Sequence, residues 1–119
     1  MMRSSKHRPK IKKYIDTDVY EESLNRVRHI FDVFDTVVVL FSGGKDSLAV
    51  MHLVKLVSKE RGIDKVNVVF RDEELIPQVV IDFVDSYAAK DWVDMKYFAV
   101  PMYSQKYVLG STETYVQWD

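Results

Sequence analysis

The chain contains no cysteine, and no segment of it is long and apolar enough to span a membrane. The missing cysteines exclude disulfides, thiolate metal sites and a cysteine nucleophile within these 119 residues. No apolar stretch follows the basic N-terminus before Thr36, so we expect no signal peptide, and a cytoplasmic location fits the sequence. Hydrophobic residues make up 47% of the chain, enough for the modest core of one domain.

Charge is unevenly distributed along the chain, although the net charge is only −1. Residues 1–15 contain six basic side chains and no acid, so the remainder of the chain is acidic. We interpret residues 1–16 as a basic arm that precedes a domain over residues 17–119. Such an arm could contact nucleic acid or an acidic protein partner through Arg3–Lys13. The alternative is a solvated terminus without a partner.

The strongest functional signal lies in residues 36–47. An unbroken apolar run over 37–41, within a strand expected at about 36–41, predicts a central parallel strand that is covered on both faces. A pair of glycines then allows positive φ and close approach of a ligand to the backbone. A helical pattern begins at about Ser47, so free N–H groups and the positive end of a helix dipole would face the turn. This arrangement predicts an anion site, with phosphate as the usual ligand.

Helical and strand patterns alternate along the rest of the domain. Either Thr17 or Asp18 is expected to cap a first helix. Further strands are expected at about 66–70 and 95–100, and a helix is expected to begin at Pro77.

This order predicts an α/β fold with a doubly wound parallel sheet, of a partial Rossmann-like type. No secondary structure is predicted for residues 102–119. Because no closing helix follows the third strand, we expect the domain to be incomplete at its C-terminus. Further residues or another chain would complete it.

Two common phosphate-binding motifs do not fit the glycine turn. The Walker A motif requires Gly-x-x-x-x-Gly-Lys-Ser/Thr, but Val39 stands at the first glycine and Asp46 follows the lysine. The dinucleotide fingerprint requires a third glycine, which is absent nearby.

Residues 42–47 instead read Ser-Gly-Gly-Lys-Asp-Ser and meet every fixed position of the pattern Ser-Gly-Gly-x-Asp-Ser. This stretch resembles the PP-loop signature of the ATP pyrophosphatase and phosphoadenylyl-sulfate (PAPS) reductase superfamily. Asp72 and Pro77 follow the second strand as in PAPS reductase-like proteins of bacteria, phages and mobile elements. The resemblance implies that ATP or PAPS binds, that the backbone near Phe70 lies beside adenine and that Asp72 faces the cleft. A solvated turn is the alternative for Asp72.

All six residues of the turn are assigned to the nucleotide phosphates: Ser42, Gly43, Gly44, Lys45, Asp46 and Ser47. The glycines let backbone N–H groups converge, the serines offer hydroxyl donors, and the lysine brings a mobile positive charge. The aspartate cannot attract phosphate by charge. It caps the helix or, as the resemblance implies, holds Mg²⁺ that bridges to phosphate, and the two roles are compatible.

The missing cysteine bears directly on the reaction, because PAPS reductases attack the sulfonate sulfur with a cysteine. Whether the chain is an enzyme therefore stays open. One hypothesis is an ATP- or PAPS-binding part of an enzyme, where adenylation or sulfur transfer needs further residues or a partner. A second is a non-catalytic nucleotide-binding regulator that acts through a protein or nucleic-acid partner. A third is a structural α/β module with a relic loop.

Overall fold

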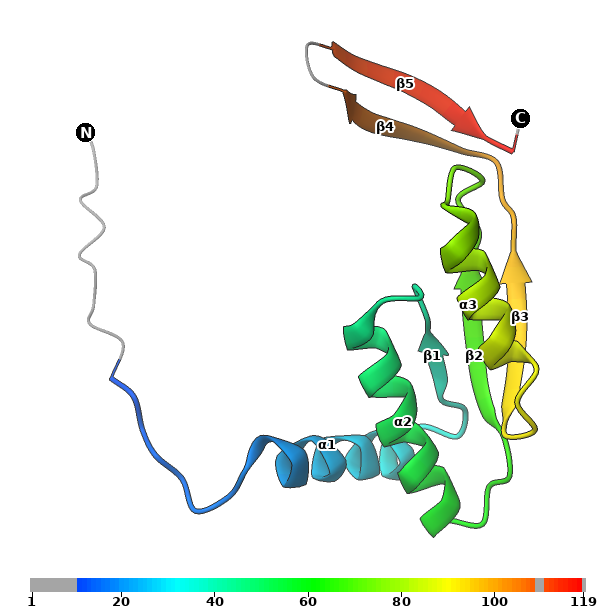
Figure 1. Cartoon of the computed structure of the whole chain (residues 1–119). Coiled ribbons are helices and arrows are strands. Elements are labelled where there is room, and N and C mark those ends of the chain that lie inside the picture. The colour runs from blue at the N-terminus through cyan, green and yellow to red at the C-terminus, as the bar shows by residue number, and fades with distance from the viewer. Residues whose placement is uncertain (1–10, 109–110, 119) are drawn as a thin grey trace.

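The computed structural model describes residues 11–108 and 111–118 (Figure 1). The N-terminal part of the basic arm, residues 1–10, lies outside the described residues. In chain order the elements are α1 (Val19–Val33), β1 (Val38–Leu40), α2 (Lys45–Glu60), β2 (Val66–Arg71), α3 (Gln78–Ala88), β3 (Val93–Phe98), β4 (Met102–Val108) and β5 (Ser111–Gln117).

Strands β1, β2 and β3 form a parallel sheet in that order, which confirms the predicted α/β class. All three predicted strands are present, with the third beginning two residues earlier than expected, at Val93. The register pairs Val39 with Val68 and Val68 with Met95, so these side chains share one face of the sheet.

Helices α2 and α3 cover that same face and lie side by side (Figure 1). Nε2 of His52 on α2 is 3.2 Å from the hydroxyl of Tyr87 on α3. Two right-handed crossovers that step in one direction across a sheet place both helices on one side, which explains the arrangement. The buried core forms between these helices and the sheet, and its most buried side chains are Phe41, Met51, Val57, Val68, Phe70 and Val84.

The prediction that β1 is covered on both faces is wrong for the described residues. Val39 is buried, but its neighbours Val38 and Leu40 are 51% and 71% exposed. Strand β1 lies at the edge of the described sheet and pairs with β2. Helices α2 and α3 both pack on the Val39 face, and α1 packs mainly on α2, so no described helix covers the opposite face. An unbroken apolar run indicates that a strand has apolar neighbours on both faces, and among the described residues β1 has them only on the Val39 face.

Helix α1 begins at the expected cap, because Oδ1 of Asp18 accepts a hydrogen bond of 2.8 Å from the backbone N–H of Glu21. It packs mainly on α2 rather than on the sheet, through its buried Leu24 and Val27. Tyr20, near the start of α1, and Phe34, its C-cap, stay more than half exposed.

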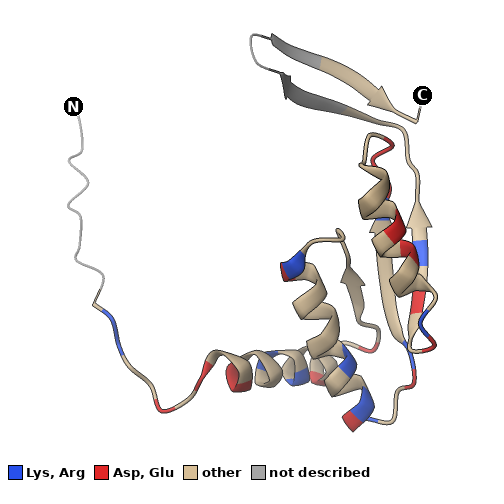
Figure 2. Cartoon of the chain, viewed as in Figure 1, with Lys and Arg blue, Asp and Glu red and all other residues tan. Residues whose placement is uncertain are grey.

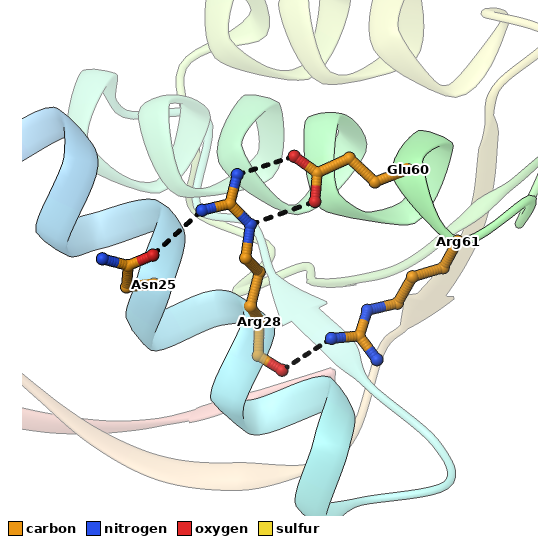
Figure 3. Close-up of polar contacts among 4 residues, drawn as sticks. All are labelled: Asn25, Arg28, Glu60 and Arg61. Atoms are coloured by element: carbon orange, nitrogen blue, oxygen red, sulfur yellow. Dashed lines mark hydrogen bonds and ion pairs between the residues drawn. The ribbon is translucent and has the colours of Figure 1, made fainter.

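A polar network fastens α1 to the end of α2 (Figure 3). The guanidinium of Arg28 donates to both carboxylate oxygens of Glu60, at 3.0 and 2.7 Å. It also donates to Oδ1 of Asn25 at 2.9 Å, while Arg61 donates to the carbonyl of Arg28 at 3.0 Å. The hydrogen bond and the positive charge of Arg28 hold the pKa of Glu60 below its usual value.

Strands β4 and β5 form an antiparallel hairpin beyond the carboxyl end of β3 (Figure 1). This hairpin occupies the range for which no secondary structure was predicted. The sequence does carry a signal, because Gly110 separates a run that contains two Tyr and a Val from a run that contains two Thr, a Tyr and a Val. Within the described residues, no helix has the length and apolar character that crossing a membrane requires.

Candidate functional site

The glycine turn lies at the carboxyl end of β1 and opens directly into α2 (Figure 1). Gly43 has a φ of +82°, a conformation that glycine adopts without steric cost. Gly44 is the N-cap of α2, and no described side chain caps the helix there. The helix therefore begins at Lys45, two residues earlier than predicted, and its first N–H groups lack partners within the helix.

Close packing against α3 constrains the turn further. A Cβ at residue 43 would lie 2.9 Å from Cγ1 of Val80 and 3.3 Å from Cγ2 of Val84. Glycine at this position thus lets the backbone of the turn touch the side chains of α3. The turn is held between α2, which it begins, and the N-terminal half of α3.

The two serines brace the turn. The Ser42 and Ser47 hydroxyl oxygens lie 3.0 Å apart, and the backbone N–H of Ser42 donates to Oγ of Ser47 at 3.2 Å. The Ser47 hydroxyl donates to the carbonyl of Gly44 at 3.2 Å, and the Gly44 N–H donates to Oγ of Ser42 at 3.3 Å. These bonds fix the width of the turn. Either hydroxyl would have to exchange such a bond in order to donate to a phosphate.

Lys45 and Asp46 are the charged residues of the turn, at the beginning of α2 (Figure 2). Their side chains are 94% and 95% exposed, and Nζ of Lys45 lies 3.5 Å from Oδ1 of Asp46. Contact between such exposed groups is weak, so the lysine can swing toward an anion. The alternative that Asp46 caps the helix is wrong, because Gly44 is the N-cap and Asp46 lies inside the first turn.

The described residues contain no group of three or more His, Asp and Glu side chains that could hold a metal by themselves. A Mg²⁺ ion near Asp46 would therefore depend on phosphate oxygens and water for most of its ligands, as Mg²⁺ commonly does. The exposed carboxylate of Asp46 is compatible with that arrangement.

The structure places Phe70 and Asp72 at the carboxyl end of β2. Phe70 is 1% exposed, and its ring packs against Tyr97 with 5.8 Å between ring centroids, so the side chain belongs to the core. Asp72 is partly buried and organises its own turn. Its Oδ1 accepts from the N–H of Glu74 at 2.8 Å, and its N–H donates to the carbonyl of Phe98 at 2.8 Å.

Trp118 is a residue of this region that the sequence did not reveal. Its Nε1 donates to the backbone carbonyl of Asp72 at 2.7 Å. The contact joins residues far apart in the chain, across a hairpin that was not predicted. A local pattern could not have indicated it.

A parallel α/β layer with a glycine turn between its first strand and the next helix defines the class of this protein. Residues 36–114, more than half of the chain, match the family model of the phosphoadenosine phosphosulfate reductase domain. The chain therefore belongs to this family, within the PP-loop superfamily, as the turn sequence predicted. No curated protein and no solved structure matches the chain.

Proposed function

We propose that this domain binds an adenine nucleotide, ATP or PAPS, with its phosphates at Ser42–Ser47. The observation that supports the proposal best is the combination of a positive-φ glycine with a helix start that no described side chain caps. Unpartnered N–H groups and the positive end of the helix dipole favour an anion at this position. Membership of the PAPS reductase family points to an adenine nucleotide as that anion.

Each charged residue of the turn has a place in this proposal. Lys45 is exposed and would approach the outer phosphates, while Asp46 would share a Mg²⁺ ion with them. In an adenylation reaction, an acceptor oxygen attacks the α-phosphorus and pyrophosphate leaves. The turn would stabilise the charge on the leaving group. Sulfur transfer needs a thiol that this cysteine-free chain cannot supply, and in this proposal both reactions proceed only with further residues or a partner.

The proposal is tested by calorimetric titration of the full chain with ATP, PAPS and AMP in the presence of Mg²⁺. We expect ATP or PAPS to bind more tightly than AMP, because the turn would contact the additional charged groups. Failure of both ATP and PAPS to bind would refute the proposal.

Gly44 offers a matched pair of variants for the same experiment. Gly44→Asp and Gly44→Asn add side chains of equal size, each with a Cβ 3.3 Å from Oγ of Ser42. Both are good N-caps, so both should keep α2 folded. The carboxylate of Gly44→Asp repels phosphate, and we expect it to weaken binding at least about tenfold more than Gly44→Asn does. Equal affinities for the two variants would contradict a phosphate site at this helix start.

A second candidate function is that of a non-catalytic regulator, and the basic arm favours it. Arg3–Lys13 carries the excess of positive charge, and the described residues Ile11 and Tyr14 are 89% and 91% exposed. Such an arm suits a nucleic-acid or acidic protein partner. Binding to duplex DNA or RNA should fall steeply with salt and should be lost when residues 1–13 are deleted. Unchanged binding after deletion would remove the arm from consideration.

A further inference from the structure

Trp118 ties the end of the β4–β5 hairpin to the turn that joins β2 to α3. Its indole Nε1 donates to the carbonyl of Asp72 at 2.7 Å, and its backbone N–H donates to Oε2 of Glu74. The carboxylate of Asp72 in turn accepts from the N–H of Glu74 at 2.8 Å. Three residues thus form one connected set of hydrogen bonds, in which Trp118 holds both acceptors.

The backbone at two of these residues is in an uncommon conformation. Glu74 has a φ of 66° and Trp118 a φ of 53°, in the left-handed region that disfavours residues with a Cβ. Such conformations persist where the surroundings fix them. Here the two residues fix one another, because the N–H of Trp118 donates to the side chain of Glu74.

The other end of the hairpin reaches the same turn. Met102, the first residue of β4, has its sulfur 3.7 Å from Nη1 of Arg71, the last residue of β2. Met102 also pairs with Gln117 across the hairpin, directly before Trp118. Both strands of the hairpin are therefore fastened at their base to the carboxyl end of β2 (Figure 1).

The fastened turn leads directly into α3, and α3 contacts the glycine turn. Pro77 is the N-cap of α3, three residues after Glu74. A Cβ added at Gly43 would meet the side chains of Val80 and Val84 on α3. A shift of the Asp72–Glu74 turn would move the start of α3 and, through these valines, the backbone of Gly43.

We infer that Trp118 is a positioning residue for the nucleotide site. Through Trp118, the base of the hairpin fixes the Asp72–Glu74 turn, which forms the outer wall of that site. Through α3, the same contact fixes the geometry of the glycine turn. This inference rests on the proposed nucleotide-binding function. It goes beyond that function by assigning a role to a residue outside the segment that matches the family. Ligands of open parallel sheets bind beyond the carboxyl ends of the strands, and the turn held by Trp118 lies at that end of β2.

The chain has two tryptophans, which makes a direct test feasible. Trp92 lies at the opposite end of the sheet, where its carbonyl accepts from the N–H of Val66, the first residue of β2. The variant Trp92→Phe leaves Trp118 as the single fluorescent indole, and Trp118→Phe leaves Trp92. Each full-length variant is titrated by calorimetry and by tryptophan emission with ATP and with PAPS.

The expected result separates the two tryptophans. Trp118→Phe keeps an aromatic ring but removes the donor to Asp72, and we expect its dissociation constant to rise roughly fivefold, as for the loss of one hydrogen bond. Trp92→Phe should bind nucleotide like the wild type. The change in its Trp118 emission should have the same midpoint as its calorimetric titration. In Trp118→Phe the emission should stay constant.

Other outcomes overturn the inference in distinguishable ways. If the wild type binds nucleotide and Trp118→Phe binds it with the same dissociation constant, the positioning role is refuted and the nucleotide site stands. The same holds if the emission of Trp118 in Trp92→Phe does not change on binding. Absence of binding to the wild type would refute the proposed function and this inference together. If thermal denaturation shows that Trp118→Phe does not fold, the change in Trp118 emission in Trp92→Phe still tests the positioning role.

Discussion

Gly43 lies so close to Val80 that a Cβ on the glycine would come within 2.9 Å of the Cγ1 of the valine. The same glycine has a φ of +82°. Two independent requirements therefore call for glycine at this position: the backbone conformation and the space against α3. The glycine turn is thus part of the packing of the domain, in addition to any role toward a ligand.

The first prediction compares Gly43 with Gly62, which also has a positive φ, +71°, but has nothing within 4 Å of an added Cβ. Gly62→Ala should lose about 1–2 kcal/mol of unfolding free energy from the backbone conformation alone. Gly43→Ala should lose that amount plus about 1–3 kcal/mol for overpacking against Val80 and Val84. Urea denaturation measures both values. Equal losses would show that α3 yields to the added methyl group.

Local patterns predicted much of this fold because local physics determines it. Asp18 caps α1 as expected. Gly62 ends α2 with the paired bonds of a Schellman motif, in which the Gly62 N–H donates to the carbonyl of Lys59 at 3.2 Å and the Ile63 N–H donates to the carbonyl of Ser58 at 2.9 Å. The alternation of strand and helix patterns predicted the parallel sheet, because strands that are linked by helices pair in parallel.

What the sequence did not predict depends on contacts between distant residues. The exposure of Leu40 depends on which elements cover each face of the sheet, and a strand's own residues do not report that. The contact between Trp118 and Asp72 depends on where a hairpin is placed. Asp46 could not be assigned from type alone, because the capping role went to the backbone position of Gly44.

The second prediction concerns stability at acid pH through the ion pair of Arg28 and Glu60. Hydrogen bonding to Arg28 lowers the pKa of Glu60 in the folded state below the usual 4.5. A lowered folded pKa means that the stabilisation is present above pH 4.5 and is lost as the pH falls through the folded value. Glu60→Gln should therefore melt at a lower temperature than the wild type at pH 7, and this difference should shrink toward pH 3. A constant difference over that range would mean that the charge on Glu60 does not contribute.

The third prediction concerns stability at alkaline pH and involves Tyr97 on β3. Partial desolvation of a side chain that stays 47% exposed, followed by the hydrogen bond that its hydroxyl donates to Oδ1 of Asp85 at 2.7 Å, raises the pKa of Tyr97 to about 12. The neutral phenol is favoured in the folded state, so its contribution is complete below the usual value of 10.0 and is lost as the pH rises toward about 12.

Ultraviolet titration of tyrosinate checks this expectation. Tyr97→Phe should remove the component that titrates near pH 12, and Asp85→Asn should move that component to lower pH because it removes a neighbouring negative charge. A titration curve that is the same in wild type and Tyr97→Phe above pH 11 would contradict the assignment.

The last prediction separates membership of the family from the reaction for which the family is named. Reduction of PAPS requires a thiolate that attacks the sulfonate sulfur and displaces the nucleotide, which leaves a thiosulfonate. A second thiol, such as that of thioredoxin, then releases sulfite as a disulfide forms, and these 119 residues contain no cysteine to supply the first thiolate. We expect the chain to release no sulfite from PAPS, even with reduced thioredoxin present, under conditions in which calorimetry detects nucleotide binding. A cysteine-containing PAPS reductase assayed in parallel shows that the assay works. Sulfite above the level of a no-protein control would mean that another group of this chain, or thioredoxin acting on the bound nucleotide, performs the transfer.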